Sequence, residues 1–556
     1  MRRRVRRALG VARDVFDALA RRPRPVVCAL IAANVTATAL FALAVPHNGW
    51  VWYQGGDQIF YASEGALVAG LHLPPADLGF GWPFVLAPIR WVTGPAYTQM
   101  LPVVILLQVL VLGPVALLSI YSLATRIGGR LLGYWATLLW VVAPFASIPL
   151  FVSRYEGRYE DQILPQSLGL TALADYPSMV ALLVSAALAA RAIALDSMRD
   201  GAIAGLVLGF AIGIKPPNAL FALAALAAFT LARRWRTGAA VAAALIPALV
   251  CLTVWKSRGL GQVPLFSLGH ERLAAGVDHL PAIGGVHVGR YVHLDWDHWK
   301  QEMDQLREFF WSSRLAQWAP FAGLLAVARR TWPLAALLGG WLGAFVVVKG
   351  FSPAASIESG SFWRLLMPAW PAYLLLFASI PLLAPTLAPR LGWRLTPPSA
   401  APAGTRPVAV AAIVLAALPL AAVIGLRPLA AQEAKPAVIQ QMGEKILLTA
   451  TDQSIKLSVR AQGGARALTW HTPHYGPAVF YRIYRTDNPR GDTRCENPGG
   501  SARCFLVSTA IATTRTPRFV DRSPPKHPFY RIGVGTNYLD DPSGGDVFIF
   551  GPETAG

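Results

Sequence analysis

The chain has 556 residues, of which 54% are hydrophobic and 14% are charged, and its mean hydropathy is +0.43. Soluble domains carry about 25% charged residues, so this composition excludes an ordinary water-soluble enzyme and indicates a surface that largely faces lipid. The net charge of +20 is interpreted as membrane topology and headgroup contact. No zinc-finger, RNA-binding or basic-zipper motif accompanies the charge, so no nucleic-acid partner is expected.

The N-terminus, residues 1–25, is rich in arginine and is predicted to be cytoplasmic. The apolar segment that follows, residues 26–46, has about the length needed to cross a bilayer as one helix. Signal peptides begin in a similar way, but no clear small-residue cleavage site follows this segment. It is therefore interpreted as an uncleaved signal anchor.

Ten further segments have the apolar character of membrane spans, although some are short. The chain is therefore predicted to be a polytopic α-helical membrane protein with about eleven transmembrane helices. The short pair between residues 199 and 232 is alternatively a helical hairpin that crosses only part of the bilayer. The ten segments lie near residues 99–124, 131–152, 174–194, 199–213, 217–232, 238–255, 315–328, 332–349, 362–384 and 407–426.

The basic residues predict the orientation of these spans. When the spans alternate from a cytoplasmic N-terminus, every short cytoplasmic loop carries arginine, which favours an odd number of spans and an extracytoplasmic C-terminal tail. The loop at residues 256–314 is basic although it falls outside, but long loops follow the rule poorly. The arginines of the cytoplasmic loops are Arg126, Arg130, Arg191, Arg199, Arg233, Arg234, Arg236, Arg329, Arg330, Arg390, Arg394 and Arg406.

This topology predicts a multi-pass protein of the cell membrane with five parts. A transmembrane domain with extracytoplasmic loops follows the basic N-terminus. A linker rich in Pro, Ala and Arg then precedes the last span and a small extracytoplasmic all-β domain. The parts are residues 1–25, 26–384, 385–406, 407–427 and 430–556.

The C-terminal tail alternates apolar and polar residues between turn signals, which predicts β-strands. Trp470 on an early strand, Tyr481 in mid-domain and Tyr530 on a late strand resemble the pattern of a fibronectin type III sandwich. Cys495 and Cys504 lie in a Gly-, Pro- and Asn-rich hairpin. They are predicted to form a disulfide if the tail lies in an oxidising space; two unrelated free thiols are the alternative.

The first outside loop, residues 47–98, contains two further helical elements. Residues 58–70 are typical of an amphipathic helix lying at the membrane surface. Residues 80–92 are apolar, short and broken by proline, which suits an interfacial or re-entrant element. Asp57 follows two glycines just before the first element. It is either the N-cap of that helix or a carboxylate held at the surface as a general base.

The long outside loop combines acidic groups, histidines and tryptophans. Their spacing matches no standard zinc motif. Acidic groups beside indole rings suit sugar recognition, because carboxylates accept hydroxyl hydrogen bonds and indoles stack on apolar sugar faces. The alternative is an amphipathic interfacial helix with an aromatic belt. The residues are His293, Asp295, Trp296, Asp297, His298 and Trp299.

Four short motifs on the predicted outer side carry isolated charges: YQGGDQIF with Asp57, LADYPSM with Asp175, AIGIKPPN with Lys215 and FWRLLMPAWP with Arg364. In their order and common sidedness they resemble the GT-C superfamily of integral-membrane glycosyltransferases, over about the first 380 residues. Many relatives carry two adjacent acidic residues in the first motif, whereas Gln58 follows Asp57 here. The departure leaves open whether a divalent cation is a cofactor.

The resemblance implies a sugar donor linked to polyprenyl phosphate, and an extracytoplasmic glycan, lipid or protein as acceptor. Asp57 would be the catalytic base of an inverting displacement. Lys215 and Arg364 would hold the donor phosphate, and Asp175 would orient the sugar or the acceptor. The lipid bilayer is the remaining partner.

Each of these charges also has a purely structural interpretation. Asp175 could cap its helix, and Lys215 and Arg364 could extend along the apolar surface to the headgroups. Glu160 and Asp161, in the charged stretch RYEGRYED of the loop at 153–173, are further candidates for substrate binding, but mixed charge in a loop is usually solvated.

Two other functions fit the same topology. A transporter or flippase of a lipid-linked saccharide would place ionisable groups near the bilayer midplane and often shows internal repeats. A non-catalytic membrane anchor would display the β-sandwich for carbohydrate or protein binding. The charges at the outer rim favour the glycosyltransferase.

Overall fold

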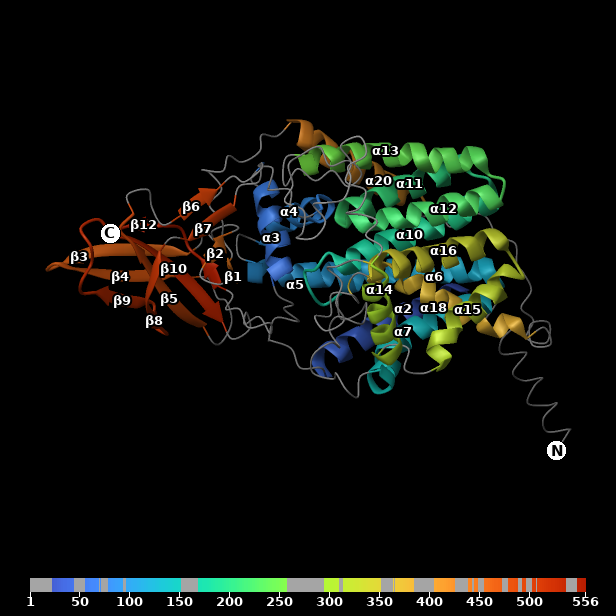
Figure 1. The fold of residues 1–556 in the computed structure, drawn as a ribbon, viewed down its shortest axis with the longest axis horizontal. Coiled ribbons are helices and arrows are strands. Elements are labelled where there is room, and N and C mark those ends of the chain that lie inside the picture. The colour runs from blue at the N-terminus through green and yellow to red at the C-terminus, as the bar shows by residue number, and fades with distance from the viewer. Residues whose placement is uncertain are drawn as a thin grey trace.

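The chain folds into a bundle of helices with a group of β-strands beyond one end of it (Figure 1). The computed structural model describes most of the bundle and most of the strands. The described residues are 23–44, 56–69, 71, 79–93, 97–151, 169–257, 295–309, 314–351, 364, 366–384, 405–425, 439–442, 445–448, 455–472, 479–488, 493–496, 503–506, 508–536 and 548–556.

Every predicted span coincides with a helix or a run of helices, which confirms the polytopic helical class. A π-helical turn, η1, joins α5 and α6 into one continuous run, and 3-10 turns flank α12 and α18. The elements are α2 (Pro23–Ala44), α5 (Tyr97–Leu107), η1 (Gln108–Leu112), α6 (Gly113–Gly128), α7 (Arg130–Phe151), α10 (Asp175–Leu195), α11 (Met198–Ile214), η2 (Pro216–Ala219), α12 (Leu220–Leu231), α13 (Trp235–Ser257), α15 (Arg314–Ala328), α16 (Trp332–Gly350), η4 (Met367–Ala369), α18 (Trp370–Ser379), η5 (Ile380–Leu383) and α20 (Thr405–Gly425).

Six of these stretches are long and apolar enough to cross a membrane, judged by length and composition. They are α2, the run from Met100 to Gly128, α10, α13, α16 and α20. Four shorter apolar helices accompany them. The short pair α11 and α12 is divided at Lys215, where α11 ends and η2 begins.

Helix α10 forms the centre of the bundle, since 16 of its 21 residues are buried. A helix that is apolar on every side must be covered on every side, and α10 packs against α6 and α11. Helix α11 in turn lies close against α13. A Cβ added at Gly205 would come within 2.4 Å of the Val241 carbonyl oxygen, so only glycine allows this approach of the two helices.

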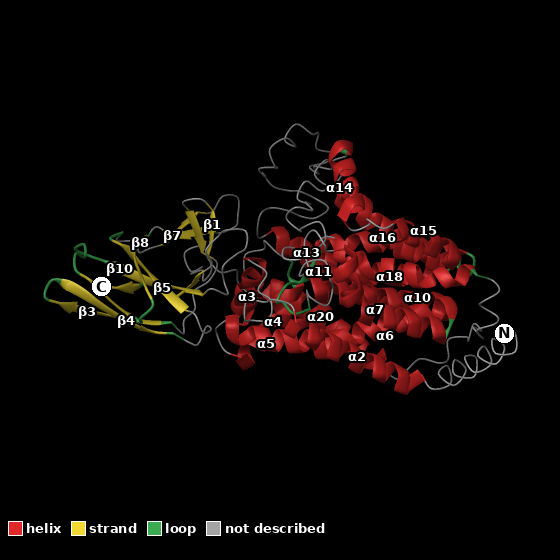
Figure 2. Cartoon of the chain, turned by 90° about the horizontal axis from the view of Figure 1, so that it is seen from below, coloured by secondary structure: helices red, strands yellow, loops and turns green. Residues whose placement is uncertain are grey.

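Three more helices are found in the described part of the chain. Helices α3 (Gly56–Ala69) and α4 (Gly81–Thr93) match the two predicted elements of the first outside loop. Figure 1 shows α3 running across the end of the bundle nearest the strands. Helix α14 (Trp296–Phe309) stands out from the bundle beside α16 in Figure 2.

The strands form two sheets of a sandwich and one smaller sheet. One sheet of the sandwich has the order β3-β4-β9, and the other has β11-β10-β5-β8, with β12 also paired to β10. The smaller sheet has the order β1-β2-β7-β6. The strands are β1 (Ile439–Met442), β2 (Lys445–Leu448), β3 (Lys456–Gln462), β4 (Ala465–His471), β5 (Val479–Thr486), β6 (Thr493–Glu496), β7 (Arg503–Leu506), β8 (Thr509–Thr514), β9 (Arg518–Asp521), β10 (Phe529–Thr536), β11 (Phe548–Phe550) and β12 (Thr554–Ala555).

The predicted aromatic residues form the core between the two sheets. Trp470 on β4 meets Tyr481 on β5 edge to face, with ring centroids 5.3 Å apart. Alternating residues of β10, among them Ile532 and Val534, are also buried there and follow the two-residue period of a strand. The prediction of a C-terminal β domain is confirmed.

Tyr530 is fully buried, and its hydroxyl donates to Asp521 Oδ2 at 2.6 Å. Asp521 also accepts from Arg485 Nη1 at 2.8 Å and from the Ser523 backbone N–H at 3.2 Å. Burial raises the pKa of Asp521, but the bonds from Tyr530 and Arg485 outweigh it and hold that pKa below its ordinary value. The tyrosine thus anchors to a carboxylate, where a tyrosine corner uses the backbone.

The backbone register places Cys495 of β6 directly opposite Cys504 of β7. Opposed residues of antiparallel strands lie about 4.5 to 5.5 Å apart at Cα, within the range that a disulfide spans. The disulfide stays a prediction that this register allows. The placement of the β domain outside the cytoplasm and the boundaries of the five parts also stay predictions, and nearly all of the linker at 385–406 lies outside the described residues.

Candidate active site

The first component of the candidate site is Asp175, which opens α10 and is fully buried. The N-cap residue is Ala174, which makes no side-chain cap. A carboxylate in the first turn complements the positive end of the helix dipole. An unpaired buried charge would cost several kcal/mol, so Asp175 needs positively charged partners.

The second component is Lys215, at the point where α11 stops. Two prolines follow it, and a residue before proline is pushed out of the helical region. Lys215 accordingly has an extended backbone, with φ −134° and ψ 107°. Its N–H still bonds to the Ala211 carbonyl at 2.9 Å, and its side chain extends from the end of α11 to Asp175.

The third component is Arg364, which lies just ahead of η4 and so far from the others in sequence. The prolines of the motif explain the turn, since Pro368 begins the 3-10 helix near its first position and Pro371 begins α18. The segment brings the Arg364 guanidinium to within 3.2 Å of Asp175 Oδ2.

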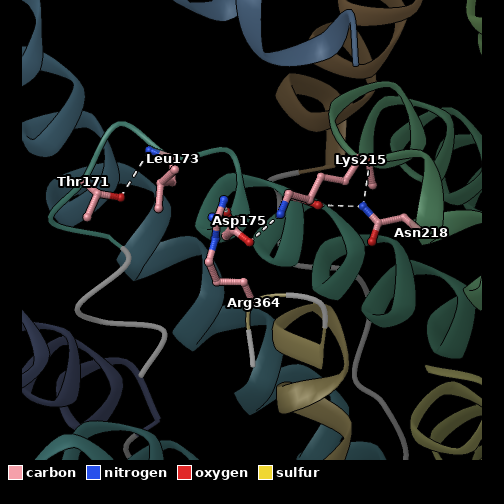
Figure 3. A network of polar contacts seen from close by, with 8 residues as sticks. Thr171, Leu173, Asp175, Lys215, Asn218 and Arg364 are labelled. Atoms are coloured by element: carbon pink, nitrogen blue, oxygen red, sulfur yellow. Dashed lines mark hydrogen bonds and ion pairs between the residues drawn. The ribbon is translucent and has the colours of Figure 1, made fainter. Parts of the chain in front are cut away.

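The three side chains form one ion-pair cluster, and Figure 3 shows the two cations reaching the carboxylate from different elements. Lys215 Nζ pairs with Oδ1 of Asp175, and Arg364 Nη2 pairs with Oδ2. The carboxylate is fully buried, whereas the side chains of Lys215 and Arg364 are 17% and 20% exposed. The carboxylate therefore faces the cations, and the cations retain the only exposed surface of the cluster.

Asn218 holds the helix break in place. Its side-chain amide donates to Ser178 Oγ of α10 at 2.6 Å and to the Ala211 carbonyl of α11 at 2.7 Å. Its backbone N–H donates to the Lys215 carbonyl at 3.0 Å. Asn218 thus ties the residue that carries the ammonium group to the helix that carries the carboxylate.

The buried segment that precedes Asp175 is fixed by three distant side chains. Gln58 Oε1 accepts from the Ala172 N–H at 2.7 Å, and Trp82 Nε1 donates to the Ala172 carbonyl at 3.0 Å. Gln108, the first residue of the π turn, donates to the Thr171 carbonyl. Elements α3, α4 and η1 therefore meet at the start of α10.

This arrangement brings α3 to the start of the helix that bears Asp175. Asp57 lies in the first turn of α3, directly before Gln58, whose side chain contacts a residue three positions before Asp175. Only the backbone of Asp57 is described. Asp57 is therefore the neighbour of Gln58, the residue that connects α3 to the segment before Asp175.

A second contact joins the same loop to the end of α11. Cβ atoms added at Gly79 or Gly81 would lie 2.3 Å from the Gly213 carbonyl oxygen and 2.7 Å from the Ile214 nitrogen, respectively. Real Cβ atoms do not approach that closely, so glycine is required where the loop crosses the helix end just before Lys215.

The structure therefore unites Asp175, Lys215 and Arg364, which lie 189 residues apart in sequence at the extremes. Glu160 and Asp161 lie outside the described residues. The residues that build the frame of the site were not predicted from the sequence. The signal that could have found them is a polar side chain within an apolar or interfacial helix, and they are Gln58, Trp82, Gln108 and Asn218.

The described part of the cluster does not suit a divalent cation, since its one carboxylate is taken by two positively charged side chains. Among the residues described, no group of three or more His, Cys, Asp or Glu side chains could hold a metal ion. The charges of the described cluster therefore favour an anionic ligand.

The acidic and aromatic motif of the long loop forms the start of α14. Asp295 Oδ1 accepts from the N–H groups of Asp297 and His298 at 3.1 and 3.0 Å, so it is the N-cap of this helix. Trp299 stacks on Phe351 at 5.9 Å, which anchors α14 to the end of α16. His293 lies outside the described residues. The contacts favour an anchored surface helix over a metal site.

Comparisons with known proteins find similarity to solved structures. No protein-family model matches the chain, and no curated protein matches it. The chain is similar to the single-particle cryo-EM structure of the arabinosyltransferase EmbB from Mycobacterium smegmatis, with 12% sequence identity and a TM-score of 0.36, over 94% of this chain and 64% of that one. The chain thus spans less than two thirds of the length of that protein.

Proposed function

We propose that this protein is an integral-membrane glycosyltransferase of the GT-C type. It transfers a sugar from a polyprenyl-phosphate-linked donor to an extracytoplasmic glycan, lipid or protein. The observation that carries the proposal is the meeting of Lys215 and Arg364 on Asp175 beside the helix that bears Asp57. Residues from four separate segments converge at one end of the bundle.

The two cations suit the phosphate of the donor. Arginine and lysine bind phosphate through charge-assisted hydrogen bonds, and both side chains keep exposed surface for a ligand. In the reaction the bond from the anomeric carbon to the phosphate oxygen breaks, and the polyprenyl phosphate leaves with the electron pair. Preorganised cations stabilise the charge that develops on this leaving group.

Asp57 serves as the base. It takes the proton of the acceptor hydroxyl while the acceptor oxygen bonds to the anomeric carbon from the face opposite the phosphate. One base and one leaving phosphate make an inverting displacement the simplest mechanism. The support for this role is the position of Asp57 in α3, one residue before Gln58 and its contact to Ala172.

Asp175 has a different role in this proposal from the one its motif suggested. Because its carboxylate is fully buried between two cations, it is a positioning residue for Lys215 and Arg364. Sugar or acceptor binding would need an exposed oxygen.

The two alternative functions, a transporter and a non-catalytic anchor, require other arrangements of charge. A transporter needs ionisable groups along a route through the bilayer, whereas this cluster lies at the helix ends next to the surface helix α3. A non-catalytic anchor has no use for a carboxylate that holds two half-buried cations. The proposed role of the β domain is to bind an acceptor glycan or a partner.

The test is transfer by Asp57→Asn, measured in membranes supplied with polyprenyl-phosphate-linked pentoses and hexoses. Loss of a general base lowers the rate by about 10²- to 10⁴-fold. Asp304→Asn is the matched control, since Asp304 is exposed on α14. Full transfer by a normally inserted Asp57→Asn protein would refute the proposed mechanism.

A further inference from the structure

Lys349 is a third cation at the same end of the bundle. It lies in the last turn of α16, four residues after Phe345 and eight after Trp341, both fully buried. Residues at this spacing share one face of a helix. The exposed residues Val347 and Val348 lie on other faces. Lys349 therefore continues the inward-facing row of α16 and is itself half-buried.

Helices α12 and α16 run antiparallel beside each other. The rings of Phe221 and Trp341 meet edge to face with centroids 5.1 Å apart. One turn further along α12, a Cβ added at Gly340 would lie 3.1 Å from that of Ala224. These two contacts fix the position of α12 along the axis of α16.

Lys215 and Lys349 are equally far along the chain from the contact between Ala224 and Gly340. Lys215 precedes Ala224 by nine residues, and Lys349 follows Gly340 by nine. Both intervals are largely helical, with rises of about 1.5 to 2 Å per residue. By this register, Lys215 and Lys349 lie at the same level of neighbouring elements.

No described residue provides Lys349 with a hydrogen-bond or ion-pair partner. Lys215 and Arg364, by contrast, share Asp175. The Asp175 carboxylate thus pairs with two of the cations at this end of the bundle, and Lys349 adds a third positive charge there. Two like charges held together on a half-buried surface favour an anion between them.

We infer that Lys349 binds the donor phosphate together with Lys215 and Arg364, and that this three-cation site matches the released polyprenyl phosphate better than the intact donor. The inference rests on the proposed function. A sugar-linked phosphate is a diester with one negative charge, whereas a free phosphate monoester carries about −1.5 to −2 at pH 7. An extra cation that favours the later charge state stabilises bond breaking.

The neighbouring aromatic residues hold Lys349 in place. A Cβ added at Gly350 would lie 2.7 Å from Trp299 Cδ1, so α14 packs directly on the residue after Lys349. Trp296 also meets Phe351 edge to face at 5.0 Å. The end of α16 is therefore fixed by contacts on its far side, which limits the freedom of the lysine backbone.

The experiment is direct binding of two probes to the full-length protein in detergent: farnesyl phosphate and its monomethyl ester, which differ by one charge. Lys349→Met should weaken farnesyl phosphate binding by about tenfold or more and ester binding much less. Lys349→Arg should restore most of the affinity. Lys300→Met is the matched control, since Lys300 is 69% exposed on α14, and should change either affinity by less than about twofold.

The outcomes separate the inference from the proposed function. If Lys349→Met and Lys349→Arg both bind farnesyl phosphate as the unaltered protein does, the inference fails and the proposed function stands. Equal losses for the two probes would likewise overturn the match to the released phosphate. If the unaltered protein binds neither probe, the proposed donor class fails, and the inference fails with it.

Discussion

Helices α10 and α11 carry an ion pair at each end, and the two ends differ in how the pair is built. At one end Arg191 of α10 pairs with Asp200 of α11 at 2.9 Å. At the other end Asp175 of α10 pairs with Lys215 of α11. The order of charge is reversed, and both pairs fasten the same two helices.

The Arg191–Asp200 pair closes the α10–α11 hairpin, and the other contacts at this end come from residues close in sequence. Ser197 caps α11 by accepting from the Asp200 N–H at 3.2 Å, and Asp196 takes the left-handed conformation that ends α10. Both charged side chains are nearly buried, at 11% and 5% exposure. Nearby Arg126 bonds to the Ser122 carbonyl in its own helix. These contacts explain a helix connection without any ligand.

The Asp175 end differs in its remote partner and its exposed cations. Arg364 arrives from a segment 189 residues away, and its side chain and that of Lys215 keep about a fifth of their surface exposed. A helix hairpin needs neither feature. Two ion pairs between the same helices thus differ in the origin of their partners and in how exposed their charged side chains remain.

The largest expected effect comes from removing the shared carboxylate. Asp175→Asn removes the carboxylate that Lys215 and Arg364 share, and breaking a buried pair costs about 3–5 kcal/mol. Asp200→Asn leaves only Arg191 and should cost less. The free energy of unfolding of both variants, measured in mixed micelles with denaturant, ranks the two ends. Equal free energies of unfolding for the two variants would contradict the difference between the two ends of α10 and α11.

A smaller effect is expected from the contact that joins α3 to the site. Gln58→Met keeps the volume but leaves the buried Ala172 N–H without its acceptor, at a cost of about 1–3 kcal/mol. Transfer should also fall, because α3 carries the proposed base. Thermal unfolding and the transfer assay on the same sample check both. A variant that keeps full stability would mean that α3 is held by other contacts.

The smallest effect concerns the β domain. The folded pKa of Asp521 lies below its ordinary value, so its contribution is present above about pH 4, the unfolded pKa, and is lost as the pH falls through the folded value. Pulse-labelling hydrogen exchange of β10 should show less protection at pH 3 than at pH 7. Asp521→Asn should weaken protection at pH 7 and flatten this pH dependence; an unchanged profile would contradict the assignment.

Much of the fold could be predicted because it depends on local patterns. Apolar runs predicted the spans, and alternation predicted strands such as β5 and β10. The gap between the predicted spans 199–213 and 217–232 falls where α11 ends. Arg364 was identifiable because a charge beside a proline-rich helix start is conspicuous in an apolar chain.

The frame of the site was less accessible, since it depends on contacts between distant residues. Gln58 reads as part of an amphipathic helix, yet it bonds to Ala172 across 114 positions. The burial of Asp175, on which its proposed positioning role rests, also requires knowledge of what covers α10. Likewise, no local pattern could show that Tyr530 bonds to the Asp521 carboxylate.

The most direct test of the account is undecaprenyl phosphate binding by two arginine variants at opposite ends of α10. Arg364→Gln should weaken binding by about tenfold or more, because it removes a charge-assisted contact to the phosphate. Arg191→Gln should bind as the unaltered protein does. Equal binding by both variants would contradict a phosphate site at Asp175, Lys215 and Arg364.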